Sequence, residues 1–465
     1  MAKTETGQVV SVPGAGGGAL DRYFMISERG STVRTEITAG ITTWLTMAYI
    51  LFVNPQILGL DGAGLPFAAT LTATALCAGV MTILMGVIGR YPFALAAGLG
   101  LNAFVAFTLV VGNGLTFPQA MGVIVAEGVL ITILVLTNVR TLILDAIPMD
   151  LKRAIGIGIG AFIALIGLIN AGIVTNEGPT PLSLVGELTT WRIFVFAAGF
   201  TIMAALVARK VRGALLIGIA ASTVIAIIAN ELNDTSIWPN GIATFPTDVW
   251  EAPDFSIIGD VSFGFVEALG WATAIAAVIS VMLSDFFDTM GTVIGIGGEA
   301  KLLDRDGRLP GIKRVLLVDS VAAAAGGLTS SSSNTTYIES ASGVSDGGRT
   351  GLASVVTGVL FLAAMFFSPI AGVIPAEATA PALVLVGYFM MTMVKDIDWA
   401  DPGIGIPALL TVVMMPFTYS ITNGVGAGFV SYVVIAVLRG RWKEVHPLMY
   451  IVAGIFAWYF IHGVV

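Results

Sequence analysis

Residues 278–295 read VISVMLSDFFDTMGTVIG and establish the class of this protein more directly than any other part of the chain. At about 1.5 Å per residue, an apolar helix of this length crosses most of a hydrocarbon layer about 30 Å thick. The run nevertheless contains two acids, Asp285 and Asp288. Acids inside a membrane span are costly unless they face a cavity, a partner or a proton. The stretch therefore predicts a membrane protein whose function depends on ionisable groups inside the bilayer.

The composition of the whole chain supports this interpretation. Of the 465 residues, 56% are hydrophobic and only 11% are charged, whereas soluble chains carry about 25% charged residues. The one cysteine, Cys77, cannot form an internal disulfide, and the two histidines, His446 and His462, lie near the C-terminal end. Proton chemistry in the body of the chain must therefore fall to carboxylates. No nucleophile or metal constellation stands out, so we expect no enzyme activity, no cofactor, no metal and no nucleic-acid partner.

The distribution of apolar runs predicts about fourteen transmembrane segments in two sets of seven. The runs begin near Glu36, Ala68, Pro92, Pro118, Leu151, Trp191, Gly213, Trp271, Ile312, Ser331, Gly351, Thr379, Gly405 and Gly424. If the N-terminus is cytoplasmic, the Lys and Arg residues assigned to the loops lie on the cytoplasmic side, with the single exception of Arg192. This distribution agrees with the positive-inside rule. Residues 231–260 then form an external loop, and the apolar run 447–460 is barely long enough to span.

Two pairs of segments resemble each other across the halves. Residues 147–169 parallel residues 374–396, and residues 218–228 parallel residues 428–438. Their offset is seven spans, and an odd offset inverts the second half relative to the first. Inverted repeats with a binding site near the midplane are typical of transporters. The sequence therefore predicts an all-α polytopic membrane protein built as a 7+7 inverted repeat.

The third and tenth segments have the composition of broken helices. The third, PFALAAGLGLNAF (92–104), begins with proline and carries two glycines, and the tenth, TSSSSNTTYIESASG (329–343), is rich in hydroxyls. We expect each to form a short extended stretch that leads into a half-helix, whose free N–H groups and positive dipole end face a ligand. The alternative is that both are external loops or re-entrant packing elements.

The intramembrane acids supply the candidate site. Asp285 and Asp288 share one helix face at i, i+3 spacing, although one of them could be a purely structural acid. Glu339 lies where the tenth segment meets its half-helix, although it could simply cap that helix. Asn102 occupies the matching place in the third segment, although its amide could simply bond unwound backbone.

Two further intramembrane acids lie in unbroken segments. Glu127 belongs to the fourth segment and Asp319 to the ninth. For these we expect interhelical hydrogen bonding rather than a place in the site.

Several stretches together resemble one known family. They are TTWLTMAYILFVNPQIL (42–58), AGLGLNAF (97–104), SDFFDTMGT (284–292) and ESASGVSDGGRTGL from Glu339, and the tail MMPFTYSITNGVGAGF with EVHPLMY fits as well. They resemble the azaguanine/hypoxanthine-type purine permeases of the nucleobase:cation symporter 2 superfamily. The resemblance covers nearly the whole chain.

The resemblance implies a core domain that carries the site and a gate domain that forms a homodimer contact. The core would comprise residues 36–138 and 271–370, and the gate residues 139–230 and 371–439. The remaining parts would be a cytoplasmic N-terminal segment (1–35), an external linker (231–270) and a basic loop with an apolar tail (440–465).

The resemblance also assigns roles to residues. Asp285 and Glu339 would bind the purine and Asn102 would help, while Asp288 and Glu339 would support the site or couple it to protons. Candidates for lining the pocket are Ala97, Gly98, Thr289, Thr336 and Ser340. The residue before Gly98 is often proline in the family and is Ala97 here, which leaves the start of the third half-helix and the selectivity in question.

We therefore expect a secondary active transporter in the cytoplasmic (inner) membrane that imports adenine, guanine, hypoxanthine or xanthine by proton symport with alternating access. Its partners would be the purine, protons and the lipid bilayer. One alternative is an anion transporter of the same inverted-repeat fold, although two acids in the site argue against an anion. Another is a permease for uracil or a different nucleobase. The preferred purine and the choice between H⁺ and Na⁺ stay open at this point.

Overall fold

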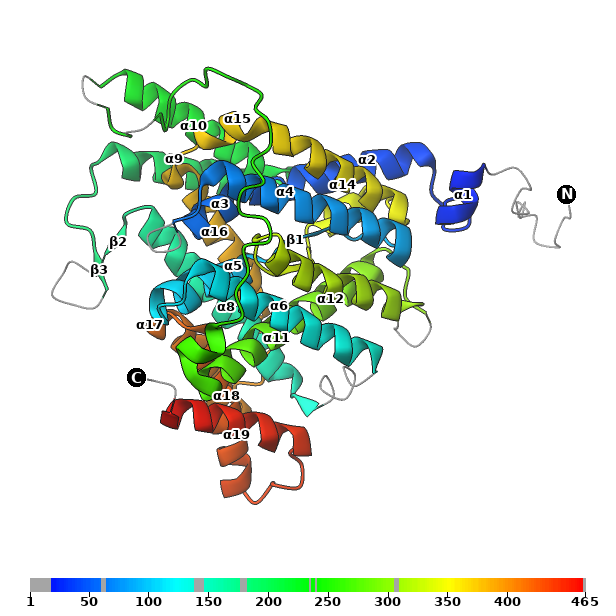
Figure 1. The fold of residues 1–465 in the computed structure, drawn as a ribbon, viewed down its shortest axis with the longest axis vertical. Coiled ribbons are helices and arrows are strands. Elements are labelled where there is room, and N and C mark those ends of the chain that lie inside the picture. The colour runs from blue at the N-terminus through cyan, green and yellow to red at the C-terminus, as the bar shows by residue number, and fades with distance from the viewer. Residues whose placement is uncertain are drawn as a thin grey trace, which may run out of the picture.

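The described part of the protein is a helical bundle with two small antiparallel sheets (Figure 1). The structure, a computed structural model, describes residues 18–59, 64–137, 146–175, 182–233, 236–238, 241–304 and 309–462. Within them, ten helices are long and apolar enough to cross a membrane. Shorter apolar helices cover Leu99–Gly112, Pro402–Thr418 and Pro447–Ile461. The expectation of a mostly helical, multi-pass membrane protein is therefore confirmed.

One group of helices combines segments from both halves of the chain. Its long members are α2 (Val33–Met47), α3 (Ile50–Gly59), α4 (Phe67–Leu84), α6 (Phe117–Leu136), α11 (Phe265–Glu299), α12 (Ile312–Leu328) and α14 (Gly351–Ala364). Its short members are α1 (Ala19–Phe24), η1 (Met85–Gly89), α5 (Leu99–Ala103), η2 (Phe104–Gly112), α13 (Ser340–Ser345), η3 (Met365–Phe367) and α15 (Ser368–Gly372). Helix α14 packs on α2 and α4, and α6 packs on α11 and α12. Where α4 and its π-helical extension η1 cross α14, a Cβ at Gly351 would collide with the backbone of Gly86, so glycine lets the two backbones touch.

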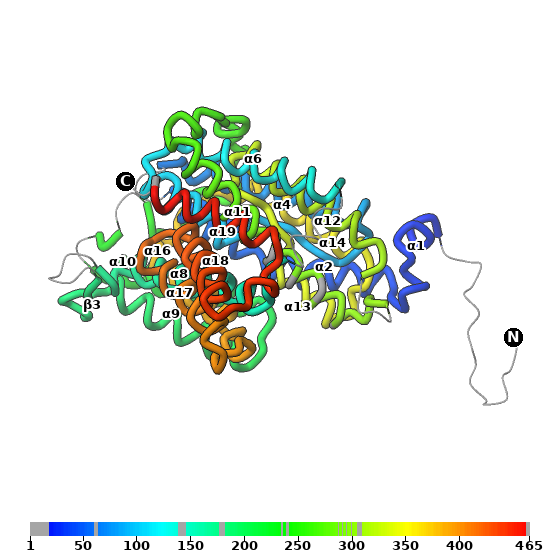
Figure 2. The backbone as a smooth tube through the Cα atoms, turned by 90° about the horizontal axis from the view of Figure 1, so that it is seen from below, coloured from blue at the N-terminus to red at the C-terminus, as the bar shows by residue number. Residues whose placement is uncertain are grey.

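A second group also draws on both halves. It consists of α8 (Met149–Asn170), α9 (Trp191–Ala208), α10 (Ala214–Glu231), α16 (Ala376–Met391), η4 (Thr392–Asp396), α17 (Pro402–Thr418) and α18 (Ile421–Leu438). Helix α8 packs on α16 and α17, and α9 packs on α10. The loop between α8 and α9 carries the paired strands β2 (Val174–Thr175) and β3 (Ser183–Leu184). Figure 2 shows this group beside the first, so the chain crosses repeatedly between two bodies of helices.

The start of α11 differs from the sequence expectation, and the C-terminal apolar run forms a helix. The span expected to begin near Trp271 is part of α11, which begins at Phe265 and changes direction at Gly270, where φ is +73°. Only glycine adopts such a backbone without strain. The apolar run 447–460 belongs to α19 (Pro447–His462), which packs on α18 and α11 (Figure 2). The hydroxyl of Tyr459 on α19 donates to Asn423 Oδ1 at 2.8 Å.

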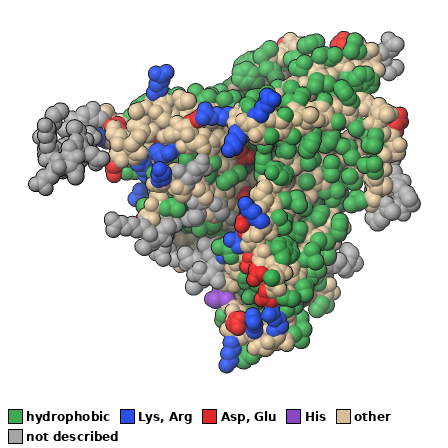
Figure 3. Space-filling view, turned by 180° about the vertical axis from the view of Figure 1, so that it is seen from behind, with side chains coloured by type: hydrophobic (Ala, Val, Ile, Leu, Met, Phe, Trp, Pro, Cys, Tyr) green, Lys and Arg blue, Asp and Glu red, His purple; other side chains and the backbone are tan. Residues whose placement is uncertain are grey.

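The surface has the character expected for a protein surrounded by lipid. Figure 3 shows hydrophobic side chains over a broad face, with many of the Lys, Arg, Asp and Glu residues gathered along its border. Large apolar side chains are exposed there and elsewhere, among them Trp271 at 68%, Phe417 at 73% and Leu438 at 80%. Water would not tolerate so much contiguous apolar surface, whereas a bilayer covers it.

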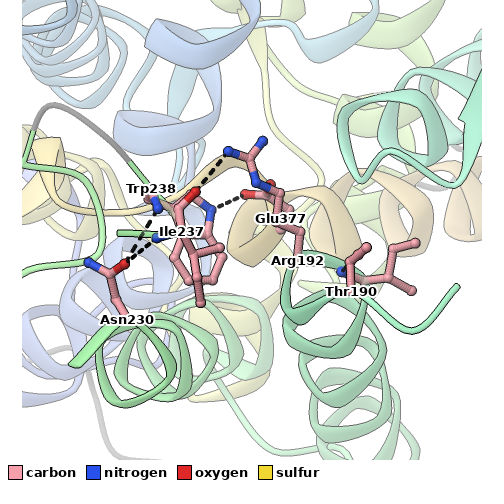
Figure 4. A network of polar contacts seen from close by, with 7 residues as sticks. Thr190, Arg192, Asn230, Ile237, Trp238 and Glu377 are labelled. Atoms are coloured by element: carbon pink, nitrogen blue, oxygen red, sulfur yellow. Dashed lines mark hydrogen bonds and ion pairs between the residues drawn. The ribbon is translucent and has the colours of Figure 1, made fainter. Parts of the chain in front are cut away.

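A polar network fixes the segment after α10 to helices of the second group (Figure 4). The indole N–H of Trp238 donates to Glu377 Oε2 at 3.0 Å, and Arg192 Nε lies 3.6 Å from Glu377 Oε1. Arg192 also donates to the carbonyl of Ile237, and Asn230 Oδ1 accepts from the N–H groups of Ile237 and Trp238. Glu377 is only 5% exposed, so this carboxylate needs these donors.

We predict that Trp238→Phe lowers the stability of the protein by about 1–3 kcal/mol, because it leaves a buried carboxylate oxygen without its donor. The measurement is the thermal unfolding midpoint in detergent. Trp250→Phe is the matched control, since Trp250 is 62% exposed. Equal midpoints for the two variants would contradict a stabilising role for this network.

Candidate functional site

The two broken segments pair with each other inside the first helix group. Strand β1 (Leu95–Ala97) runs antiparallel to β4 (Asn334–Thr336), with Ala96 opposite Thr335. The N–H of Gly98 donates to the carbonyl of Ser333 at 3.0 Å. Each strand leads into a half-helix, α5 after β1 and α13 after β4. The extended stretches predicted from sequence are therefore present, and they satisfy each other's backbone groups, as irregular backbone at membrane depth must.

Asp319 on α12 holds this crossing in place. Its Oδ1 accepts from the N–H of Thr336 at 3.1 Å and from the Thr336 hydroxyl at 2.8 Å. Its Oδ2 accepts from the hydroxyl of Thr289 on α11 at 2.8 Å. Asp319 thus forms the hydrogen bonds between elements that were predicted for it.

Three of the candidate pocket residues are fully buried and bonded within the protein. Thr289 and Thr336 donate to Asp319, as described above, and the N–H of Ala94 donates to Ser340 Oγ at 3.0 Å. All three side chains are 0% exposed. In this structure their hydroxyls stabilise the strand crossing.

The two acids of α11 lie in different surroundings. Asp285 is 1% exposed, and its carboxyl contacts that of Glu127 on α6. Asp288, one turn further along, is exposed although it lies in the middle of an apolar span. A helical spacing of i, i+3 therefore brings the two acids to one side of α11 but not into one environment.

Asp288 lies near the half-helix of the tenth segment. The charged groups that act on it in the described structure are both carboxyls, those of Glu339 and Asp319. Glu339 occupies the N-cap position of α13 and is half-buried. The hydroxyl of Tyr49 donates to Glu339 Oε1 at 2.7 Å. Together these residues place two carboxyls, one of them oriented by a buried tyrosine, where the broken segments meet α11.

Asn102 contributes from the other half-helix. Its side chain is 0% exposed, and within the described residues Oδ1 receives no hydrogen bond. Its amide nitrogen lies 3.5 Å from the carbonyl of Ala97, which is the limit for a hydrogen bond. The hydroxyl of Tyr337 donates to that same carbonyl at 2.5 Å. A Cβ at Gly98 would lie 3.0 Å from the Thr335 side chain, so this turn is tightly packed.

The described residues offer little support for other kinds of site. They contain no cluster of three or more His, Cys, Asp or Glu side chains that could bind a metal. A cavity of about 240 Å³ lies between α2, α4, α10 and α14, and its lining includes Trp44, Leu71 and Leu216. That lining is apolar, and none of the candidate acids belongs to it. The candidate site is therefore the strand crossing and not this cavity.

Tyr49 and Tyr337 were not among the sequence candidates. Tyr49 lies in the stretch 42–58, which carried the family resemblance, but its contact with Glu339 joins residues 290 positions apart. Tyr337 belongs to the hydroxyl-rich run. Its aromatic ring among serines and threonines was the one feature of the sequence that could have marked it as a site residue. Spacing along a helix could not reveal either contact.

Comparison with known proteins places this chain among permeases. Residues 34–427 match the sequence profile of the permease family. The adenine permease AdeP of Escherichia coli is 40% identical over 442 residues, covering 95% of this chain and 96% of the relative. The guanine/hypoxanthine permease PbuO of Bacillus subtilis is 38% identical over 437 residues, covering 93% and 98%. The relatives are transporters and not enzymes.

The fold is similar to that of solved anion transporters. The transmembrane domain of the cyanobacterial bicarbonate transporter BicA aligns with a TM-score of 0.59 at 13% identity, over 85% of this chain and 97% of the other. SLC26A9 aligns with a TM-score of 0.58 at 12% identity, over 88% of this chain and 66% of the other. At such low identity these matches establish the shared fold alone.

The different exposure of the two α11 acids predicts a difference in chemical accessibility. In a Cys77→Ser background, Asp288→Cys should react with a polar thiol reagent at least about ten times faster than Asp285→Cys, because thiol reactivity requires exposure. Cys77 is itself buried, so its removal should be tolerated. Rates are measured by mass spectrometry on folded protein in detergent. Equal labelling rates would contradict the placement of these two residues.

Proposed function

This chain belongs to the permease family, and we propose that it imports purine nucleobases across the cytoplasmic membrane in symport with protons. The observation that carries the proposal is the carboxyl site, Asp288 with Glu339, at the crossing of two broken segments inside the membrane-spanning bundle. The relatives named as adenine and guanine/hypoxanthine permeases, which align over nearly the whole chain, support a purine as the substrate.

The chemistry of a purine fits these groups. A purine presents ring N–H donors and ring nitrogen acceptors. Glu339 and Asp285 supply carboxyl oxygens for the N–H groups, and Asn102 Oδ1 offers a further acceptor. Asp288, exposed beside Glu339, supports the site. Tyr49 orients Glu339 from α2–α3. A site with fixed hydrogen-bonding groups discriminates strongly, because a wrong base leaves a buried polar group unpaired.

Transport requires that the site open to each side of the membrane in turn. We propose that the chain forms about fourteen spans in a 7+7 inverted repeat with a cytoplasmic N-terminus. The first helix group would be the moving core, and the second the gate that forms a homodimer contact.

Polar contacts between the two groups fit this motion. Arg212, between α9 and α10, forms an ion pair with Asp346, which follows α13. The hydroxyl of Thr108 on η2 donates to the carbonyl of Tyr419 between α17 and α18 at 3.1 Å. These contacts must break and re-form if one group moves against the other.

The principal alternative is an anion transporter, because the solved structures of similar fold include a bicarbonate transporter. Several carboxyls close to the binding position would repel an anion, whereas they favour the N–H groups of a base. A uracil permease is a second alternative. Competition by bases and anions in one uptake assay separates these functions.

We predict that Asp285→Asn and Glu339→Gln each reduce purine uptake into proteoliposomes by about 10- to 100-fold, since each removes a charged acceptor worth about 1.5–3 kcal/mol. Asp288→Asn should reduce uptake less. Asp260→Asn, an exposed acid outside the spans, is the matched control. Uptake is measured with labelled hypoxanthine under an inward proton gradient. Normal uptake by either of the first two variants would remove that residue from the substrate site.

A further inference from the structure

Two carboxyl groups meet within the first helix group without taking part in the pair formed by Asp288 and Glu339. Glu127 on α6 is 0% exposed and Asp285 on α11 is 1% exposed. Their side chains are within hydrogen-bonding reach of each other, and the two helices pack together. Glu127 lies in an unbroken helix, so the sequence suggested only a structural role for it.

The surroundings of Glu127 supply little else to stabilise a negative charge. Oε2 accepts a long hydrogen bond of 3.4 Å from Ser333 Oγ. Oε1 is fully buried and receives no N–H or O–H from the residues that the structure describes. An oxygen in that position lacks a donor unless a proton lies between it and the neighbouring carboxyl.

The charged groups that face Glu127 are all acidic. Asp285 faces it from α11 and Asp319 acts on it from α12, while η2, which also packs on α6, contains no charged residue. The oxygens of Asp319 are already used by Thr289 and Thr336. Two carboxylates in contact strongly destabilise each other when both are ionised and enclosed without a cation or water. One proton shared between Glu127 and Asp285 resolves this conflict.

We propose that Glu127 and Asp285 form a shared-proton site that carries the coupling proton, an assignment that rests on the proposed proton symport. A proton from the outer solution forms an O–H bond with the Glu127 carboxylate, and this O–H donates to Asp285. The pair then carries one negative charge, located on Asp285, and that carboxylate accepts the N–H of the purine. After the site opens inward, the base leaves and the Glu127 O–H bond breaks to return the proton to the inner solution.

The alternative position for the proton, on Asp288 or Glu339, fits the contacts less well. The side chain of Asp288 is exposed, whereas those of Glu127 and Asp285 are enclosed by the protein. Glu339 is half-buried and accepts the hydroxyl of Tyr49 at 2.7 Å. Glu127 and Asp285 are the fully buried pair, and Asp285 links proton occupancy directly to the proposed purine site.

The experiment compares proton-driven accumulation with exchange in proteoliposomes that contain the full chain. For one proton per base, a gradient of one pH unit supports about tenfold accumulation of hypoxanthine. Glu127→Gln mimics the protonated carboxyl, so we expect it to exchange labelled for unlabelled base while accumulation falls to equality across the membrane. For the wild type we expect the affinity for hypoxanthine to fall as pH rises. For Glu127→Gln we expect the affinity not to fall as pH rises. Glu127→Asp should restore coupling, and Glu267→Gln, an exposed acid on α11, is the control.

Each outcome decides between the proposals. Wild-type accumulation or wild-type pH dependence in Glu127→Gln overturns the shared-proton site while leaving proton symport in place. Loss of both exchange and accumulation in Glu127→Gln, without recovery in Glu127→Asp, also overturns it and makes Glu127 structural. If the wild type itself exchanges hypoxanthine but does not respond to the proton gradient, proton symport and the shared-proton site fail together. If the wild type does not exchange hypoxanthine, the proposed substrate fails as well.

Discussion

Backbone hydrogen bonding at membrane depth is the constraint on which the rest of this structure depends. Lipid offers no partner to a free N–H or C=O group, so two segments that leave the helical conformation must bond to each other. Strands β1 and β4 do so, and Asp319 bonds β4 to α11. The half-helices that follow are thereby held in fixed positions, and their ends converge on the acids of α11. Without the strand pairing there would be no reason for polar side chains to gather there.

The acids are tolerated because each has a distinct means of accommodating its charge. Asp319 receives hydrogen bonds from Thr289 and Thr336, Glu339 receives the hydroxyl of Tyr49, and Asp288 is exposed. Asp285 lies against the carboxyl of Glu127 instead, and the proposed shared proton would remove one of the two charges. A single polar cluster therefore contains acids held by donors, an acid with an exposed side chain and an acid paired with another acid. The proposal that different acids bind the base and the proton rests on these differences.

The sequence predicted the class of protein and the two broken segments, because hydropathy and composition are local properties. It also selected Asp285, Asp288 and Glu339, since acids are rare inside spans. It could not predict that β1 pairs with β4, or that Tyr49 reaches Glu339, because these contacts join residues more than 200 positions apart. Helical spacing suggested one shared environment for the α11 acids, whereas packing against α6 separates them. The early start of α11 at Phe265 depends on the unusual backbone of Gly270, which no apolar pattern reveals.

The central claim is that a purine and a proton cross the membrane together. The most direct measurement is the internal pH of proteoliposomes loaded with a fluorescent pH indicator, with equal pH on both sides and no sodium. Addition of hypoxanthine outside should acidify the lumen, and bicarbonate or uracil should not reproduce the effect through this protein. Entry of labelled hypoxanthine without any change in internal pH would contradict proton symport, and acidification abolished by Asp260→Asn as fully as by Glu339→Gln would contradict the proposed site.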